Sequence, residues 1–346
     1  MTKIKPFEQV SYLTQIRRLR ALAIEAACAF PVKIKKIDFI RYGANAIFKV
    51  TDTSHKKYLL RIHPADYNTR AAILEEFKWV NHLFKTTDIP VATPIHTRQG
   101  SYLMLQAQAG IMEPRYCDML TWLDGKFLWK SINEKYAYNL GVLMGRLQRS
   151  GKEIAIKHRY YWDAGSLVGT DKARCGNIEN LSGISKAQQK ILTDARCCAY
   201  EKLTEYEKAY PDKSGLIHGD LNPNNIIITH QHYGAIDFDD CGIGLYGIDL
   251  ATPLLAFEHL AEDQGKNFNA LKDALLLGYS EHMPLAQTDI DMIPYFLLAL
   301  KLHSVAWLNL KKDNARLRPW FLKAVQRAII FFEQNHRISK IFQRKT

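Results

Sequence analysis

Residues 216–250 read LIHGDLNPNNIIITHQHYGAIDFDDCGIGLYGIDL, and this stretch decides the fold. Asp220 and Asn225 precede one short apolar run, and Asp237 ends a second one. Two such runs predict a β-hairpin, whose end loops would hold these three side chains in one small volume. Phosphoryl transfer needs a carboxylate that orients the attacking hydroxyl and oxygen ligands for the Mg²⁺ that bridges the phosphates. The spacing therefore indicates a phosphoryl-transfer site, although an ordinary turn with self-bonded Asn and Asp side chains has the same residue types.

The chain on either side of this stretch divides into a β-rich part and a helical part. An opening helix over 8–29 precedes a predicted antiparallel meander, an inserted helix and two further strands, at residues 37–41, 46–51, 57–62, 69–84, 101–105 and 115–123 in that order. Beyond residue 133 the apolar spacing is mainly helical, over 133–150, 185–210, 267–280, 289–310 and 318–335. We therefore expect an α+β protein with an N-terminal β-rich domain (1–125) and a helical C-terminal domain (126–346).

The charge of the chain is unevenly distributed. The net charge of +12 combines +9 in residues 1–61 and +8 in residues 311–346 with −5 in between. Within 214–300, two lysines face twelve Asp and Glu. A basic protein suggests a nucleic-acid or anionic-membrane partner, but the acidic centre favours solvated basic ends, so we expect no nucleic-acid partner and no obligate protein partner.

Cysteine usage and hydropathy indicate a cytoplasmic protein. The six cysteines include no CxxC pair, so they predict reduced thiols rather than a zinc site or a disulfide framework. The most apolar stretch, 295–310, contains Lys301, His303 and Asn309 and falls short of a roughly 20-residue membrane span.

Seven motifs in a set order give the chain a resemblance to a known family. They are YLLRI (58–62), EFKW (76–79), VATPI (91–95), LDG (123–125), HGDL (218–221), IDFD (236–239) and DLA (249–251). In this combination, over residues 20–330, the chain resembles the aminoglycoside phosphotransferase and choline kinase superfamily. The resemblance implies a bilobal, protein-kinase-like fold and transfer of the γ-phosphoryl group of ATP or GTP, with Mg²⁺, to a hydroxyl.

The resemblance also implies roles for the residues of the deciding stretch. Asp220 would be the catalytic base, and Asn225 and Asp237 would bind Mg²⁺ with help from Asp239. Two more residues would support the site without taking part in chemistry: His218 would support the loop, and Asp249 would accept its backbone hydrogen bonds.

Two positions depart from the family pattern. The third strand normally presents a Lys to the phosphates, held by a Glu of the next helix, but here the residue is Arg61, with Glu76 aligned as its partner beside Glu75. Arg keeps the charge with a planar fork in place of a compact ammonium, and an exposed strand arginine is the alternative interpretation. The loop over the nucleotide has one glycine, Gly43, and so offers fewer free N–H groups to phosphate.

The nucleotide base and the acceptor are expected at less specific positions. Adenine is expected between the lobes near Leu120, Trp122 and Leu123, although aromatic residues such as Trp122 and Trp129 are more often core. Trp162 and Trp307 are equally compatible with the acceptor pocket and with the core.

The acceptor is expected to be a small molecule. Protein kinases have Lys where Asn222 stands, and the interval from Asp237 to Asp249 leaves no room for a phosphorylated activation loop. The acidic centre favours an amine-bearing acceptor such as an aminoglycoside or amino alcohol. The alternatives are a Ser/Thr protein kinase of the same superfamily and a nucleotide-binding pseudokinase.

Overall fold

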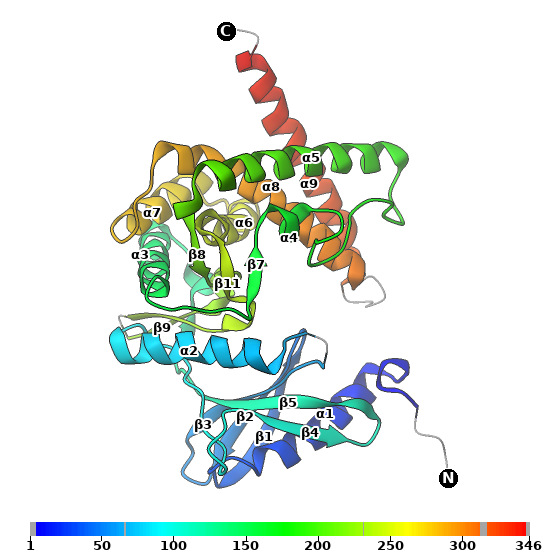
Figure 1. Ribbon diagram of the computed structural model, residues 1–346, viewed down its shortest axis with the longest axis vertical. Helices are drawn as coiled ribbons and strands as arrows, with labels where there is room; N and C mark the ends of the chain where they lie inside the picture. The colour runs from blue at the N-terminus through cyan, green and yellow to red at the C-terminus, as the bar shows by residue number, and fades with distance from the viewer. Residues whose placement is uncertain (1–4, 66, 231, 312–316, 344–346) are drawn as a thin grey trace. The chain divides into compact units, whose positions relative to one another are not determined.

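The computed structural model describes residues 5–65, 67–230, 232–311 and 317–343, which divide into two compact units (Figure 1). The first unit comprises the chain up to Lys126 together with Ile156–His158 and Ile227–Asp239. The second comprises Phe127–Ala155, Arg159–Ile226 and the chain from Asp240 onward. The main division lies one residue from the expected boundary, but two later segments belong to the first unit, which a linear boundary does not capture.

The first unit is built on a five-stranded sheet of order β1-β2-β3-β5-β4, in which all neighbours are antiparallel. Its strands are β1 (Ile34–Tyr42), β2 (Ala46–Asp52), β3 (Lys57–Ile62), β4 (Met104–Gln108) and β5 (Ile111–Thr121). The predicted meander is confirmed.

Two helices cover the two faces of this sheet. Helix α1 (Tyr12–Ala27) packs with Leu60 and Ile62 of β3 in one core, whereas α2 (Arg70–Thr86) packs with Leu59 and Leu120 in another. Successive strand residues point to opposite faces, so Arg61 of β3 lies on the α2 side. The short helix η1 (Phe7–Gln9) precedes α1.

A small second sheet has the order β10-β9-β6. Its strands are β6 (Lys126–Phe127), β9 (Ile226–Thr229) and β10 (His232–Ala235), and the last two are the predicted β segment of the deciding stretch. Two short helical turns follow the loops of that stretch, η4 (Pro223–Asn225) and η5 (Phe238–Asp240).

The second unit is mainly helical. Its helices are η2 (Leu128–Ser131), α3 (Glu134–Gly151), α4 (Ala164–Val168), α5 (Lys186–Ala209), η3 (Pro211–Lys213), α6 (Tyr246–Gln264), α7 (Phe268–Ser280), α8 (Gln287–Leu310) and α9 (Arg318–Gln343). A three-stranded sheet of order β7-β11-β8 accompanies them, from strands β7 (Tyr160–Trp162), β8 (Ser214–Ile217) and β11 (Gly242–Leu245). The protein is α+β, as expected.

Helix α6 was not predicted from the sequence. Eight of its residues are buried, on more than one side, so no polar face marks the helical period. Gly247 and Pro253, which usually argue against a helix, both lie inside it. Helix α6 therefore owes its formation to tertiary packing.

Helix α8 is long and apolar enough to cross a membrane by length and composition, with a mean hydropathy of 1.3 over its most apolar window. The expectation that Lys301, His303 and Asn309 exclude a span by composition is therefore wrong. Of this most apolar part of α8, 56% is buried inside the protein. Lys301 of α8 pairs with Glu258 of α6. These contacts are typical of a core helix.

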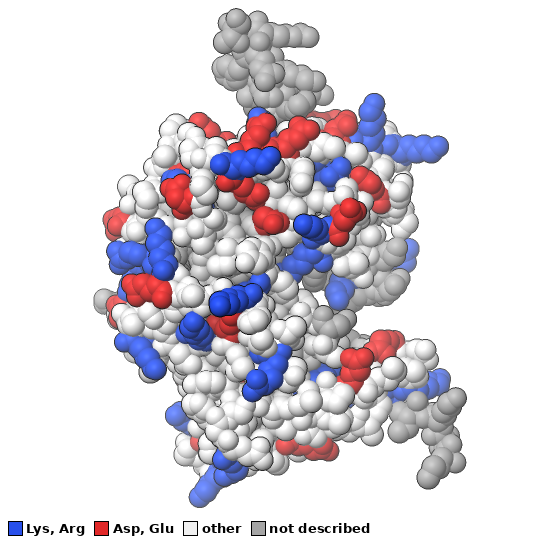
Figure 2. All heavy atoms as spheres, viewed as in Figure 1, with Lys and Arg blue, Asp and Glu red and all other residues white. Residues whose placement is uncertain are grey.

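Surface charges of both signs are intermingled. Figure 2 shows Lys and Arg side chains interspersed with Asp and Glu on the face drawn, without a continuous basic patch. For the described residues on this face, the arrangement supports the interpretation of the basic side chains as solvated surface, whereas residues 312–316 and 344–346 lie outside the described part of the chain.

Helices α3 and α7 pack backbone to backbone through two glycines. A Cβ added at Gly141 would lie 2.0 Å from the carbonyl oxygen of Leu275, and one at Gly278 would lie 2.0 Å from that of Tyr138. Only glycine allows this approach.

We predict that Gly141→Ala lowers the free energy of unfolding by about 2 kcal/mol or more, because overpacking forces the two helices apart. Urea denaturation measures the change. Gly43→Ala is the matched control, since a Cβ there meets no atom within 4 Å, and equal losses in both variants would contradict the packing argument.

Candidate active site

Arg61 lies at the centre of a buried ion cluster in the first unit. Its Nε and Nη2 donate to the two carboxylate oxygens of Asp118, each at 3.0 Å, and its Nη1 donates to Glu76 Oε1 at 2.8 Å. The Arg61 side chain is 2% exposed. The predicted Arg61–Glu76 pair is confirmed, and the alternative of an exposed strand arginine is wrong.

Asp118 is the cluster residue that sequence reasoning missed. It lies directly opposite Arg61 in the register of β3 and β5 and also contacts His63, with 2.6 Å between Oδ2 and Nε2. Burial alone raises the pKa of a carboxyl group, but the charges of Arg61 and His63 prevail and hold the pKa of Asp118 below its usual range. The available signal was an acidic residue inside the apolar run CDML of a predicted strand.

Glu75 binds a different segment of the chain from the one that Glu76 binds. Its carboxylate accepts hydrogen bonds from the backbone N–H groups of Lys157 and His158, at 2.7 and 2.6 Å. These bonds explain why residues 156–158 belong to the first unit, and they leave Glu76 as the partner of Arg61.

The buried cluster reaches the IDFD motif, residues 236–239, through His63, whose Nδ1 lies 3.9 Å from Oδ1 of Asp239. Its Oδ2 accepts from Asn45 at 3.0 Å and its Oδ1 from Asn68 at 2.9 Å. Asn45 closes the loop that carries Gly43, whose N–H donates to the Asn45 carbonyl. Asp239 thus joins this loop to the motif, and its role as a metal ligand stays a prediction.

Asp237 is more accessible. Its backbone adopts φ = 66°, a conformation uncommon for a residue other than glycine, and Arg41 of β1 donates to its Oδ2 at 2.6 Å. Residues held in such uncommon backbone conformations often occur at functional sites.

The HGDL loop, residues 218–221, lies in the second unit with its carboxylate firmly oriented. Asn222 donates to Asp220 Oδ1 and Asn225 donates to Asp220 Oδ2, each at 2.8 Å. With both oxygens held by amides, the carboxylate keeps one rotamer ready to accept a proton.

Asp249 of α6 braces this loop, as predicted. Its two carboxylate oxygens accept from the N–H groups of His218 and Gly219, each at 2.9 Å. Burial raises the pKa of Asp249. His218 is itself fully buried, so it supports the loop from inside.

The donor groups suit a magnesium ion. Because the Asn225 amide nitrogen donates to Asp220, its amide oxygen remains for a metal, and Asp237 adds a hard carboxylate oxygen.

Asn45 Oδ1, His63 Nδ1 and Glu76 Oε2 are buried without a hydrogen-bond partner among the described residues. No group of three or more His, Cys, Asp or Glu in that part of the chain is arranged to hold a metal by itself. Asn225 and Asp237 lie in different units, and their convergence stays a prediction.

The remaining expected site residues divide between core and surface. Leu120 is buried beside α2, whereas Trp122 and Leu123 are half-buried, and their contact with a nucleotide base stays a prediction. Trp129 and Trp307 are exposed. Trp162 is a core residue whose indole Nε1 donates to the Asp240 carbonyl. All six cysteines are free, as expected.

Comparison with known proteins agrees with this fold. The chain resembles the solved structure of a microcompartment-associated aminopropanol kinase with a TM-score of 0.75 and 24% identity, covering 91% of this chain and 94% of that one. The amicoumacin kinase hAmiN, solved with AMP-PNP, has a TM-score of 0.75 at 18% identity, covering 92% and 96%. A protein of Deinococcus radiodurans without an assigned activity is 24% identical over 76% of this chain and 74% of its own.

The chain therefore has the fold of these kinases. The model of the phosphotransferase enzyme family matches residues 38–285, and the chain belongs to that family. It is a phosphotransferase.

We predict that Asp118→Asn lowers the free energy of unfolding by about 3 kcal/mol, because the Arg61 charge stays buried with one carboxylate partner fewer. Chemical denaturation measures it. Asp124→Asn is the matched control, since the Asp124–Lys57 pair at 2.7 Å is exposed and such pairs contribute little. A loss in the control equal to that in Asp118→Asn would contradict a special role of the buried cluster.

We also predict an acid-sensitive step in stability from His303 of α8, which packs edge to face on Trp162. Burial, helped by the charge of Arg174, lowers the pKa of His303 to about 4. The unfolded chain, with a histidine pKa of about 6.5, binds a proton that the folded protein excludes. Stability is therefore lost as the pH falls from about 6.5 to about 4.

The variant His303→Gln should show a shallower loss over this range, measured by urea denaturation at each pH. The exposed His232 supplies the control, since His232→Gln should follow the wild type. If His303→Gln lost as much stability as the wild type when the pH falls from about 6.5 to about 4, His303 would not be the group responsible.

Proposed function

We propose that the protein transfers the γ-phosphoryl group of ATP or GTP, with Mg²⁺, to the hydroxyl of an amine-bearing small molecule in the cytoplasm. The observation that carries the proposal is the Asp220 carboxylate, held by Asn222 and Asn225 on a loop that Asp249 braces. A carboxylate fixed in this way can orient a hydroxyl and accept its proton.

Several residues of the chain would share the work around Asp220. Asn225 and Asp237 would supply oxygen ligands to the metal, and the metal, when bound, neutralises charge that develops on the phosphates. Arg61 has two N–H groups beyond the three that the carboxylates accept. These would bind the phosphates without breaking the cluster. The nucleotide is supported by relatives solved with AMP-PNP and with ADP.

The amine on the acceptor is supported by two observations. Related structures include an aminopropanol kinase and a choline/ethanolamine kinase family protein, with TM-scores of 0.75 and 0.60. Residues 214–300 also carry twelve acidic groups against two lysines. Some of these carboxylates are already paired, as Asp240 is with Arg174 at 2.7 Å, so the preference would rest on the remaining ones.

Asn222 supports a small-molecule acceptor over a protein. Its side chain donates to Asp220 and caps the backbone N–H of Asn224. A protein kinase has Lys at this position. The short interval from Asp237 to Asp249 also leaves no room for an activation loop.

The test is a phosphorylation assay with ATP and GTP against amino alcohols, aminoglycosides, neutral alcohols and hydroxy acids. We expect the best turnover with an amine, and Asp220→Asn should lower kcat by roughly 10²- to 10⁴-fold. Asp194→Asn, at an exposed position of α5, is the control and should keep wild-type activity.

Two results would count against the proposal. Fastest turnover of an anionic hydroxy acid would overturn the amine preference. Absence of both a Mg²⁺-dependent thermal shift with nucleotide and any turnover would overturn nucleotide-dependent catalysis and favour a protein without activity.

A further inference from the structure

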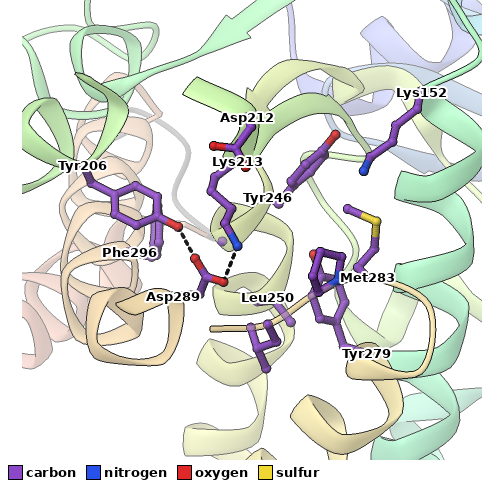
Figure 3. Close-up of a pocket in the computed structure, with 13 residues that line it drawn as sticks. Lys152, Tyr206, Asp212, Lys213, Tyr246, Leu250, Tyr279, Met283, Asp289 and Phe296 are labelled. Carbon is purple, nitrogen blue, oxygen red and sulfur yellow. Dashed lines mark hydrogen bonds and ion pairs between the residues drawn. The ribbon is translucent and has the colours of Figure 1, made fainter. Parts of the chain in front are cut away.

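A cavity of about 130 Å³ lies in the second unit (Figure 3). Lys213, which precedes β8, lines the cavity, whereas His218 follows the strand. The four residues of β8 lie between the two and span roughly 13 Å at 3.3 Å per residue. The cavity, called here the helical pocket, is therefore distinct from the candidate active site.

The inner wall of the helical pocket is apolar and buried. It comprises Leu250 of α6, Phe296 of α8 and Met283, together with the rings of Tyr246 and Tyr279. A cavity of about 150 Å³ holds a benzene molecule. The helical pocket thus has room for an aliphatic group of a few carbon atoms.

Two of the charged groups in the pocket, Asp289 and Lys213, pair with each other. Asp289 accepts hydrogen bonds from Tyr206 at 2.5 Å and from Lys213 at 2.7 Å, as the dashed lines of Figure 3 show. The Ala286 N–H donates to the same carboxylate. These groups need no ligand.

Two further charges at the rim are not neutralised in this way. Lys152 and Asp212 are both exposed, and neither has an ion-pair partner among residues 5–65, 67–230, 232–311 and 317–343. The Lys152 ammonium lies 5.9 Å from the centre of the Tyr246 ring, and the Asp212 charge acts on the same phenol. A cation and an anion beside an apolar cavity complement a ligand that carries both charges and a short apolar group.

A chain of hydrogen bonds leads from the pocket wall to the HGDL loop. The Tyr279 hydroxyl donates to Gln148 Oε1 at 2.6 Å, and Gln148 Nε2 donates to Asp249 Oδ2 at 3.3 Å. Asp249 in turn accepts from the N–H groups of His218 and Gly219. The same Gln148 nitrogen donates to the carbonyl of Tyr246, a second residue that lines the pocket.

We propose that the helical pocket binds an α-amino acid with a short aliphatic side chain, and that its occupancy is transmitted to the HGDL loop through Tyr279, Gln148 and Asp249. The carboxylate pairs with Lys152, the ammonium pairs with Asp212, and the side chain enters the apolar cavity. A ligand that packs on the Tyr279 and Tyr246 rings restrains both groups that hold the Gln148 amide, so the loop amides behind Asp249 open less often.

The binding test is isothermal titration of the full chain with L-leucine, L-leucinamide and 4-methylpentanoate. Leucinamide lacks the carboxylate and 4-methylpentanoate lacks the ammonium. We expect wild type to bind leucine roughly tenfold or more tightly than either analogue, because each analogue lacks one of the two charged groups that the rim would pair.

Two rim variants assign the charges. Lys152→Met should bind leucine and leucinamide equally, and Asp212→Asn should bind leucine and 4-methylpentanoate equally. Lys190→Met and Asp194→Asn, at exposed positions of α5, are the matched controls and should discriminate as wild type does. Absence of saturable leucine binding, or unchanged discrimination in both rim variants, would overturn the site.

The transmission is tested by hydrogen exchange of the His218 and Gly219 amides. Leucine should slow their exchange in the wild type, and Tyr279→Phe, which removes the hydroxyl but keeps the ring, should retain binding and lose this effect. Equal protection in Tyr279→Phe would overturn the proposed route. Neither readout requires turnover, so both stand apart from the outcome of the phosphorylation assay.

Discussion

The guanidinium of Arg61, held between two buried carboxylates, is the interaction on which the first unit depends. A charge removed from water is tolerated only when partners surround it in good geometry. Asp118 supplies a two-point contact from the neighbouring strand and Glu76 a third contact from α2. The position of α2 on the sheet is therefore set by charge pairing as well as by the apolar contacts of Ile73 and Phe77.

The two units organise their motif loops by the same physical means, a buried carboxylate that accepts N–H donors. Asp239 accepts from the amides of Asn45 and Asn68 in the first unit. Asp249 accepts from two backbone N–H groups in the second. Each carboxylate satisfies donors that would otherwise be buried without partners, and each thereby removes freedom from a loop that carries a predicted site residue.

Much of the fold could be predicted because its signals are local. Strands β1 to β3 are short runs rich in Ile, Val, Phe and Tyr that turn residues divide, and α2 has a clear helical period from Ile73 to Leu83. Helix α6 could not be predicted in this way, since a helix buried on several sides shows no periodicity. The short strands β6, β7, β8 and β11 also escaped, because isolated strands of two to four residues contain too little pattern, whereas β9 and β10 were found together as one longer β segment.

The sequence by itself predicted which side chains carry the chemistry, because Asp220, Asn225, Asp237 and Asp249 lie within thirty residues at a spacing that turn and hairpin geometry restrict. The resemblance to the family pattern also indicated Glu76, in the helix after the third strand, as the partner of Arg61. Only the tertiary structure decided the second partner, Asp118, which lies 57 residues away along the chain. That contact depends on the register between β3 and β5, and register is set by the packing of whole strands rather than by any local run of residues.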